Sequence, residues 1–295
     1  MNSNFIFPGQ GSQYRGLGKI LFNKSDYAKK IINTANEILE YNIKNVCCSD
    51  SNRINHTKYT QPAIFIYSII ADYLIKDAGY KPLAFAGHSL GEYTALVSSN
   101  CLNFEDAIKI VKIRAESMEE QSNIRPGSMC ALLNFSKIKF EKLKKMIDGE
   151  IVIANYNSKK QTIISGDTNA INEFILLSRK NNVRCVPINV SGAFHSPLME
   201  NVKVKLDKII KSTKFNDITT PIYQNVKPEK IFKGIEIKKN LIKQVTSPVH
   251  WSVSIKSMAE NHTNTFIEIG PGNILSKLNK NINSDINSLN FKSLL

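Results

Sequence analysis

Residues 83–100 read LAFAGHSLGEYTALVSSN, and this stretch decides the fold. The apolar run at residues 83–86 predicts a buried strand and residues 91–100 predict a helix, which together form the repeating unit of a parallel α/β sheet. The turn between them, GHSLG at 87–91, fits the G-x-S-x-G pattern, in which a sharp turn exposes a serine nucleophile at a helix N-terminus. The alternative is that Ser89 only caps the helix.

The middle of the chain has its own order of predicted strands and helices. Its order is the βαββαβ pattern of ferredoxin-like domains. The expected elements are strands at 128–135, 151–156, 161–165 and 183–190, with helices at 137–147 and 169–180. We therefore expect a ferredoxin-like subdomain, residues 128–190, inserted into a larger α/β domain formed by residues 1–127 and 191–295.

The composition is typical of a soluble globular protein. Of the 295 residues, 42% are hydrophobic and 22% are charged. The nearest candidate for a membrane span, residues 62–75, is interrupted by Asp72 and is shorter than the roughly 18 apolar residues required. Residues 62–76 are apolar nearly all round and predict a buried helix. The N-terminus has no basic region or cleavage site, which favours a cytoplasmic location. The five cysteines form no CxxC pair, so we expect neither a disulfide framework nor a zinc site.

The chain is strongly basic, with a formal charge of +14 from 39 Lys and Arg against 25 Asp and Glu. Nucleic-acid binding is one explanation of such a charge, but no RNP, zinc-finger or P-loop pattern accompanies the lysines, which are spread along the chain. A solvated lysine-rich surface is the simpler interpretation, and docking of an acidic protein is the more specific one. We expect neither a nucleic acid nor a membrane as partner.

A serine nucleophile needs a base, and the chain has five histidines. His88 adjoins the serine in a tight turn, where neighbouring side chains point apart. His56 and His262 lie in polar segments and are expected to be exposed, while His250 precedes a tryptophan and suits a packed structural role. His195 lies in the Gly- and Pro-bounded loop SGAFHSP, where the chain re-enters the larger domain, and is the candidate base. The alternative is a core histidine with no catalytic role.

Arg114 falls in the middle of the apolar face of the helix expected to begin near Asn103. At 100° per residue, this face holds Ala107, Ile110, Val111, Ala115 and Met118. A buried guanidinium without a partner costs several kcal/mol, so it should hold an anion. Either an internal carboxylate or a ligand supplies that anion, and the sequence leaves both open.

The N-terminal loop FPGQGSQ, residues 7–13, resembles a phosphate-binding turn but fails both nucleotide patterns. Tyr14 stands where G-x-G-x-x-G needs its last glycine, and Ile20 stands where a P-loop needs Ser or Thr. A G-x-S-x-G enzyme instead needs two backbone N–H groups for the oxyanion. We expect these donors to be the N–H groups of Leu90 and Gln10.

These motifs together resemble the malonyl-CoA:acyl-carrier-protein transacylase family, which includes the acyltransferases of polyketide synthases. The resemblance covers nearly the whole chain. It is carried by FPGQGSQ (7–13), TQPAIF (60–65), GHSLGEY (87–93), the Arg114 helix, ANYNS with TIISG (154–166), GAFHSPLM (192–199), SPVHW (247–251) and EIGPG (268–272). It implies a hydrolase-like parallel-sheet core that carries a ferredoxin-like subdomain.

The resemblance also implies a ping-pong reaction through a malonyl-serine. Ser89 would attack malonyl-CoA, with His195 as general base and then as acid to the leaving thiol. The backbone carbonyl matching Gln244 would orient the histidine, and Arg114 would pair with the malonyl carboxylate. The phosphopantetheine thiol of an acyl carrier protein would then take the malonyl group, so both thioesters are substrates and no cofactor or metal is expected.

Phe194, in GAFH, matches relatives that use malonyl rather than methylmalonyl groups. The sequence leaves open whether the carrier protein serves fatty-acid or polyketide synthesis, how strictly malonyl is selected, and the oligomeric state, although the family is usually monomeric. Two other functions remain as alternatives. One is a serine hydrolase that removes acyl groups from carrier protein, and the other is a basic binding protein without catalysis.

Overall fold

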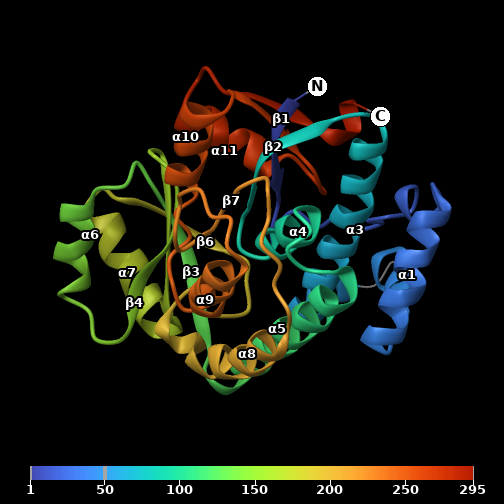
Figure 1. Cartoon of the computed structure of the whole chain (residues 1–295). Coiled ribbons are helices and arrows are strands. Elements are labelled where there is room, and N and C mark those ends of the chain that lie inside the picture. The colour runs from blue at the N-terminus through green and yellow to red at the C-terminus, as the bar shows by residue number, and fades with distance from the viewer. Residues whose placement is uncertain (1, 49–51, 295) are drawn as a thin grey trace.

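The computed structural model describes residues 2–48 and 52–294 and contains two sheets (Figure 1). The larger sheet has five strands in the order β7-β2-β1-β8-β9, and every neighbouring pair is parallel. Its strands are β1 (Asn2–Phe7), β2 (Lys81–Gly87), β7 (Ile222–Tyr223), β8 (Thr265–Glu268) and β9 (Asn287–Asn290). This confirms the predicted parallel α/β core.

Helices cover both faces of this sheet, as its two-sided hydrophobicity requires. Alternate residues of β1 point to opposite sides: Phe5 and Phe7 join the core under α3 and α5, and Ile6 joins the core under α10 and α11. The bounds of the helices around the sheet are α1 (Asp26–Leu39), α2 (Ile43–Cys48), α3 (Thr57–Asp77), α4 (Gly91–Ser98), α5 (Phe104–Ile124), α8 (Glu200–Ser212), α9 (Gly234–Gln244), α10 (Trp251–Asn261) and α11 (Ile274–Ile282).

The register of β1 on β2 brings two sequence motifs together. Phe7 pairs with Gly87, so the two parallel strands end side by side. The loop that follows β1 and the turn that follows β2 therefore leave the sheet at the same edge, which is where ligands bind in open α/β sheets. This alignment places FPGQGSQ against GHSLG although about 80 residues separate them in the chain.

The second sheet is antiparallel, with the order β4-β5-β3-β6, and it confirms the ferredoxin-like pattern (Figure 1). Residues of β3 alternate between its faces: Cys130 and Leu132 pack with α6 and α7, while Met129 and Ala131 face the larger core. The elements are β3 (Gly127–Leu133), α6 (Lys137–Lys144), β4 (Ile151–Ser158), β5 (Gln161–Asp167), α7 (Thr168–Lys180) and β6 (Arg184–Ile188).

The predicted boundaries need small corrections. The helix expected to begin at residue 62 begins at Thr57, so Pro62 lies inside it. The helix expected to reach residue 147 ends at Lys144, because the N–H groups of Met146 and Ile147 bond three residues back and close a tighter turn.

Two expectations about single residues are wrong. Cys130 and Cys185 are joined by a disulfide that links the neighbouring strands β3 and β6, whereas Cys47, Cys48 and Cys101 are free thiols. His262 is half-buried rather than exposed, because its ring bonds to the Tyr223 hydroxyl at 3.2 Å. Over residues 2–48 and 52–294, no helix is long and apolar enough to cross a membrane.

Candidate active site

The turn between β2 and α4 holds Ser89 in a strained conformation. Its φ is +53°, a region that side chains other than glycine rarely adopt. The flanking glycines are needed because backbones touch there: a Cβ on Gly91 would overlap the Phe7 carbonyl, and a Cβ on Gly87 would overlap the Gly91 backbone. The turn therefore has the shape that projects a serine side chain away from the sheet.

His195 lies against this serine. Its Nε2 is 2.7 Å from Ser89 Oγ, and its ring is 3% exposed. On the other side of the ring, Nδ1 is 3.0 Å from the Gln244 carbonyl oxygen and 3.1 Å from the Ser247 carbonyl oxygen. Two acceptors at Nδ1 fix the proton there, which leaves Nε2 free to accept the serine proton. The Ser247 carbonyl was not anticipated from the sequence.

Burial sets the protonation state of this histidine. Desolvation first, and then the nearby Arg114 charge, lower the pKa of His195 to about 3. The neutral, proton-accepting form is therefore the resting form. No carboxylate assists the ring, since both Nδ1 partners are backbone carbonyls.

Arg114 is 1% exposed and is held by neutral groups. Its Nη1 donates to Gln61 Oε1 at 2.6 Å, and its Nη2 donates to Ser89 Oγ at 3.0 Å and to Gln244 Oε1 at 3.4 Å. Its Nε has no acceptor within the described part of the chain. No ion pair joins Arg114 to an acid among residues 2–48 and 52–294. The buried Glu92 carboxylate acts on Arg114 only through space and forms no ion pair with it among the described residues, so direct pairing of the guanidinium is left to a ligand.

The two expected oxyanion donors lie at the same place. The backbone N–H groups of Gln10 and Leu90 have no acceptor among the described residues. Gly9 packs directly on the turn, because a Cβ there would overlap the His88 carbonyl and lie 3.6 Å from Leu90 N. The loop after β1 thus brings its backbone against the residue that follows Ser89, where a second donor is needed.

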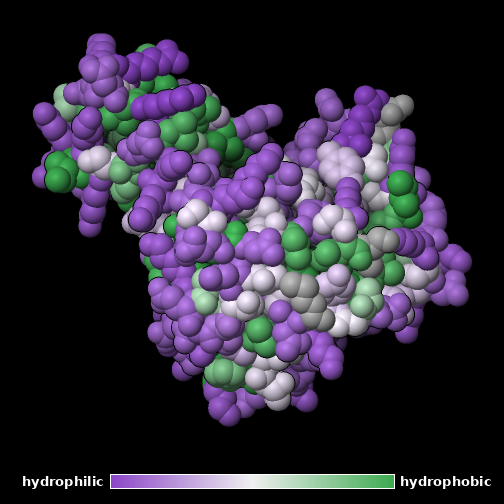
Figure 2. Space-filling view, turned by 90° about the horizontal axis from the view of Figure 1, so that it is seen from above, coloured by the Kyte–Doolittle hydropathy of each residue, from purple (hydrophilic) through white to green (hydrophobic). Residues whose placement is uncertain are grey.

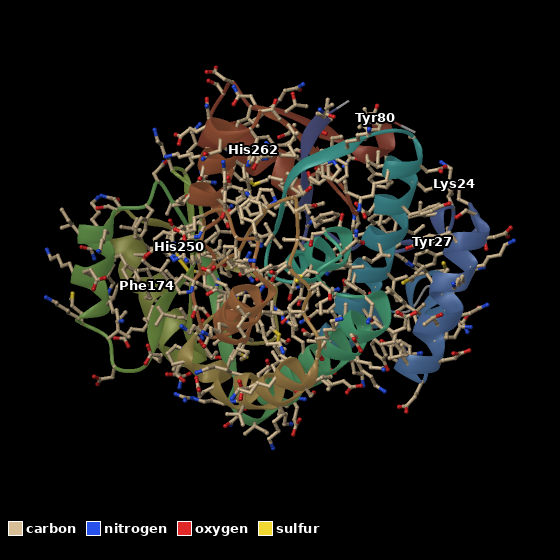
Figure 3. All side chains as sticks on the ribbon, in the orientation of Figure 1. Lys24, Tyr27, Tyr80, Phe174, His250 and His262 are labelled. Carbon is tan, nitrogen blue, oxygen red and sulfur yellow. A yellow bond between two sulfur atoms is a disulfide. The ribbon has the colours of Figure 1, made fainter. Side chains whose placement is uncertain are left out.

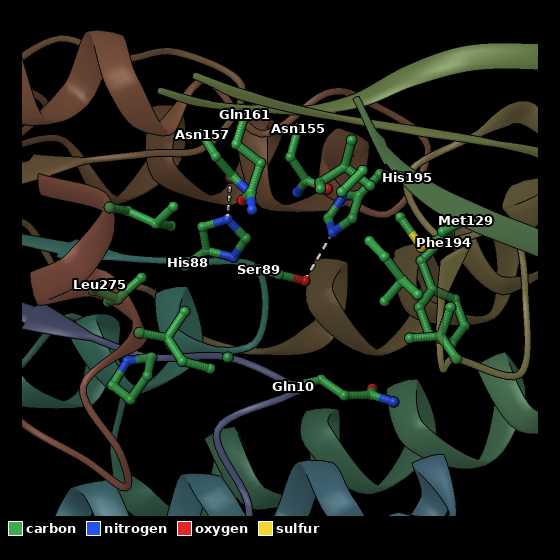
Figure 4. Close-up of a pocket in the computed structure, with 18 of the residues that line it drawn as sticks. Gln10, His88, Ser89, Met129, Asn155, Asn157, Gln161, Phe194, His195 and Leu275 are labelled. Carbon is green, nitrogen blue, oxygen red and sulfur yellow. Dashed lines mark hydrogen bonds between the residues drawn. The ribbon is translucent and has the colours of Figure 1, made fainter. Parts of the chain in front are cut away.

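These residues line one cavity of about 240 Å³ between the two sheets (Figure 4). Figure 4 shows Ser89 and His195 at its centre and Gln10 across from His195. One side is apolar and the other carries amides. The apolar side is lined by Met118, Met129, Ile163, Phe194 and Val190, and the amide side by Asn155, Asn157 and Gln161. Both units contribute to the lining, with Ser89, Met118 and Phe194 from the larger one and Met129, Ile163 and the amides from the smaller one.

Comparison with known proteins agrees with this geometry. The family model described as acyl transferase domain matches residues 4–289. The chain belongs to this family. It is 36% identical to the malonyl CoA-acyl carrier protein transacylase of Bacillus subtilis, over 97% of this chain and 92% of the relative. It is 35% identical to the transacylase of the same name from Synechocystis, over 100% of this chain and 98% of the relative.

Solved structures show the same similarity for the whole acyl transferase fold. The malonyl-CoA:ACP transacylase of Synechocystis superposes with a TM-score of 0.91 at 34% identity, over 98% of this chain and 97% of that one. A malonyl-transacylase in complex with a type II PKS acyl-carrier protein superposes with a TM-score of 0.92 at 27% identity, over 98% of this chain and 96% of that one.

Like His195, His88 lines this cavity, whereas the other histidines of this acyl transferase lie outside its lining. His88 points away from Ser89 and is 2.9 Å from Asn157 Oδ1 (Figure 4). His250 stacks on the Tyr156 ring. His250 and His262, both labelled in Figure 3, are not among the residues that line the cavity. His56 is exposed, as expected. Among the described residues, no group of three or more His, Cys, Asp or Glu is placed to hold a metal ion.

Sequence reasoning missed three polar residues beneath the serine. Gln61 holds Arg114, and Glu92 and Asn225 lie behind the turn, each at most 2% exposed. Gln61 and Glu92 lie in the motifs TQPAIF and GHSLGEY. A polar residue in an otherwise apolar segment is a sequence signal that could have identified both of them. Asn225 has no such signal.

The low pKa of His195 predicts an unusual pH profile. A neutral His195 is needed as base, so its contribution to acylation of Ser89 is kept above about pH 3 and lost only below it. The rate of Ser89 acylation by an acyl-CoA, measured by rapid quench from about pH 5 to 8, should show no protonation step of the kind that an exposed histidine gives near pH 6.5. In an Arg114→Ala variant the protonation step should move to higher pH, because one cause of the low pKa is gone. Burial raises the pKa of Glu92 to about 7, so a Glu92→Gln variant is measured beside the wild type. A step near pH 6.5 that persists in this variant would contradict the prediction.

Proposed function

We propose that this acyl transferase moves malonyl groups from malonyl-CoA to the phosphopantetheine thiol of an acyl carrier protein, through a malonyl ester on Ser89. The observation that carries the proposal is the position of Arg114. A buried guanidinium lies 3.0 Å from the serine oxygen and forms no ion pair with an acid among the described residues. An acyl group that ends in a carboxylate supplies the missing anion.

The first half-reaction needs only groups of this cavity. Ser89 Oγ attacks the thioester carbonyl while its proton passes to His195 Nε2, and the tetrahedral oxyanion accepts bonds from the N–H groups of Gln10 and Leu90. Each such donor is typically worth about 3 to 4 kcal/mol in the transition state. The C–S bond then breaks, and CoA leaves as a thiol with the proton that His195 returns.

The second half-reaction runs the same steps with a different nucleophile. His195 takes the proton of the carrier's phosphopantetheine thiol, and the sulfur attacks the malonyl ester on Ser89. The C–O bond breaks and the serine recovers its proton from His195. The Gln244 carbonyl orients the ring throughout, without adding a negative charge that would repel the malonyl carboxylate. Serine, histidine and arginine supply the nucleophile, the base and the carboxylate ligand, so the reaction requires no cofactor.

Two features narrow the substrates. Phe194 lies in the apolar wall of the cavity and is 6% exposed, which supports malonyl over the bulkier methylmalonyl group. The net charge of +14 suits an acidic carrier protein, and the surface in Figure 2 is mostly hydrophilic. Fatty-acid and polyketide carriers are both compatible with these features.

The proposal extends to the organisation and location of the protein. The catalytic unit comprises residues 1–127 and 191–295, which contribute Ser89, His195 and Arg114, and residues 128–190 form the subdomain that closes the cavity. A cytoplasmic location follows from the donor, because CoA thioesters are intracellular metabolites.

Intact-mass measurement tests the proposed function. Mixed with malonyl-CoA, the wild-type chain should gain one malonyl group, and a Ser89→Ala variant should gain none. Addition of a phosphopantetheinyl carrier protein should then remove the adduct much faster than buffer does. Absence of an adduct would reject the enzyme and leave the binding-protein alternative. Removal by water at least as fast as by carrier would identify the hydrolase instead.

A second prediction concerns the uncharged hydrogen-bond partners of Arg114, which are Gln61, Ser89 and Gln244. A Gln61→Glu variant places a carboxylate where an amide oxygen lies 2.6 Å from Nη1, so an internal ion pair should form and compete with the malonyl carboxylate. The KM for malonyl-CoA should rise by about tenfold or more, as expected when one charged contact is lost. The KM for acetyl-CoA should change little.

The matched control is Gln61→Met, which removes the same acceptor without adding charge. It should raise the KM for malonyl-CoA less than Gln61→Glu does. An equal rise of the KM for malonyl-CoA in the two variants would show that the absence of charge at position 61 is unimportant for substrate binding.

A further inference from the structure

Asn225 bridges the two peptide groups that precede the nucleophile. Its Nδ2 donates to the Gly87 carbonyl oxygen at 2.6 Å, and its Oδ1 accepts from the Ser89 N–H at 2.8 Å. The side chain is 2% exposed, so water does not replace these bonds. A single amide thus satisfies one acceptor and one donor of a turn whose central residue is in a strained conformation.

Asn225 is itself fixed from behind. Its N–H donates to Glu92 Oε2 at 2.7 Å, and its carbonyl accepts from the His250 N–H at 2.9 Å. Glu92 lies on α4, just past the turn, and its other oxygen accepts from Gln224 Nε2 at 3.0 Å. The loop after β7 is therefore tied to the helix that follows Ser89.

The opposite side of the turn has a different support. The Ser89 carbonyl oxygen accepts from Gln244 Nε2 at 2.9 Å, and it belongs to the same peptide group as the Leu90 N–H. Gln244 and Asn225 thus hold the peptides on either side of Ser89. With Asn225 removed, the peptide before the serine can rotate, and rotation there changes the direction of both Ser89 Oγ and the Leu90 N–H.

We infer that Asn225, anchored by Glu92, is a positioning residue that holds Ser89 and the Leu90 N–H in the reactive geometry. The inference rests on the proposed function only for the identity of the substrate. The positioning role itself does not depend on that substrate, because any reaction of Ser89 with an electrophile uses the same geometry. Asn225 contacts neither the cavity nor the expected path of the substrate. Its loss should therefore slow the chemical step and leave substrate binding nearly unchanged.

The test compares Asn225→Ala with Asn279→Ala. Asn279 is similarly buried and also bridges two elements, accepting from Trp251 Nε1 and donating to Ser288 Oγ, but these partners lie outside the turn that holds Ser89. Asn225→Ala should slow acylation of Ser89 by malonyl-CoA about 10- to 100-fold, with the KM for malonyl-CoA within about threefold of wild type. Asn279→Ala should lower the Tm but acylate Ser89 within about threefold of the wild-type rate.

A second variant keeps the inference testable if Asn225→Ala does not fold. Asn225→Asp keeps the acceptor for the Ser89 N–H, and only its protonated form donates to the Gly87 carbonyl. The ratio of its acylation rate to that of wild type should rise as the pH falls from about 8 to 5, a recovery that a purely structural role does not give. Glu92, His88, His195 and Arg114 lie nearby in both proteins. Because the new carboxylate would shift the titration of Glu92, whose pKa is about 7, the recovery should also appear when both proteins carry Glu92→Gln.

A serine-directed fluorophosphonate separates this inference from the proposed function. Ser89 Oγ displaces fluoride from phosphorus and its proton goes to His195, so the rate reports the turn without malonyl-CoA. The Asn225 variants should show the same losses with this probe. Labelling of Asn225→Ala within threefold of wild type, or equal rate losses in the Asn225 and Asn279 variants at equal Tm, would overturn the inference. Failure of malonyl loading in the wild type, with normal labelling, would reject only the substrate.

Discussion

The buried guanidinium of Arg114, which forms no ion pair with an acid among the described residues, is the constraint on which the rest of the site depends. A buried charge normally requires a carboxylate, yet its described partners here are two amide oxygens and the serine hydroxyl. The same charge lowers the pKa of His195 and keeps that ring neutral. In the proposed function, Arg114 would therefore keep the base neutral and bind the acyl carboxylate beside the nucleophile. A carboxylate orienting the histidine would cancel this arrangement, and backbone carbonyls take its place.

The sheet supplies the geometry that this charge needs. Parallel pairing of β1 with β2 ends both strands at one edge, so the Gln10 and Leu90 N–H groups meet beside Ser89. The second sheet adds the apolar wall of the cavity through Met129 and its neighbours. Asn225 and Gln244 then hold the peptides around the serine. The proposed selectivity and catalysis thus rest on contacts among segments that are distant in sequence.

Periodicity and glycine placement predict the antiparallel sheet and the β2–turn–α4 unit of the parallel one, because these patterns are local. They do not predict the short strands β7, β8 and β9. The position of Arg114 on the apolar face of its helix also predicts that the charge is buried. Its neutral partners could not be predicted, since Gln61 and Gln244 reach it only through tertiary packing. Asn225 sits in an irregular segment with no motif, and its role appears only once β7 pairs with β2. The disulfide joins strands whose pairing, rather than any cysteine spacing, brings them together.

Competition between acyl donors tests the central claim most directly. Wild-type protein is mixed with equal concentrations of malonyl-CoA and acetyl-CoA, and the two adducts on Ser89 are counted by intact mass at the earliest resolvable time. If the Arg114 charge selects the acyl group, the malonyl adduct should exceed the acetyl adduct by about tenfold or more, the factor that one buried charge pair supplies. Equal amounts of the two adducts would contradict the account.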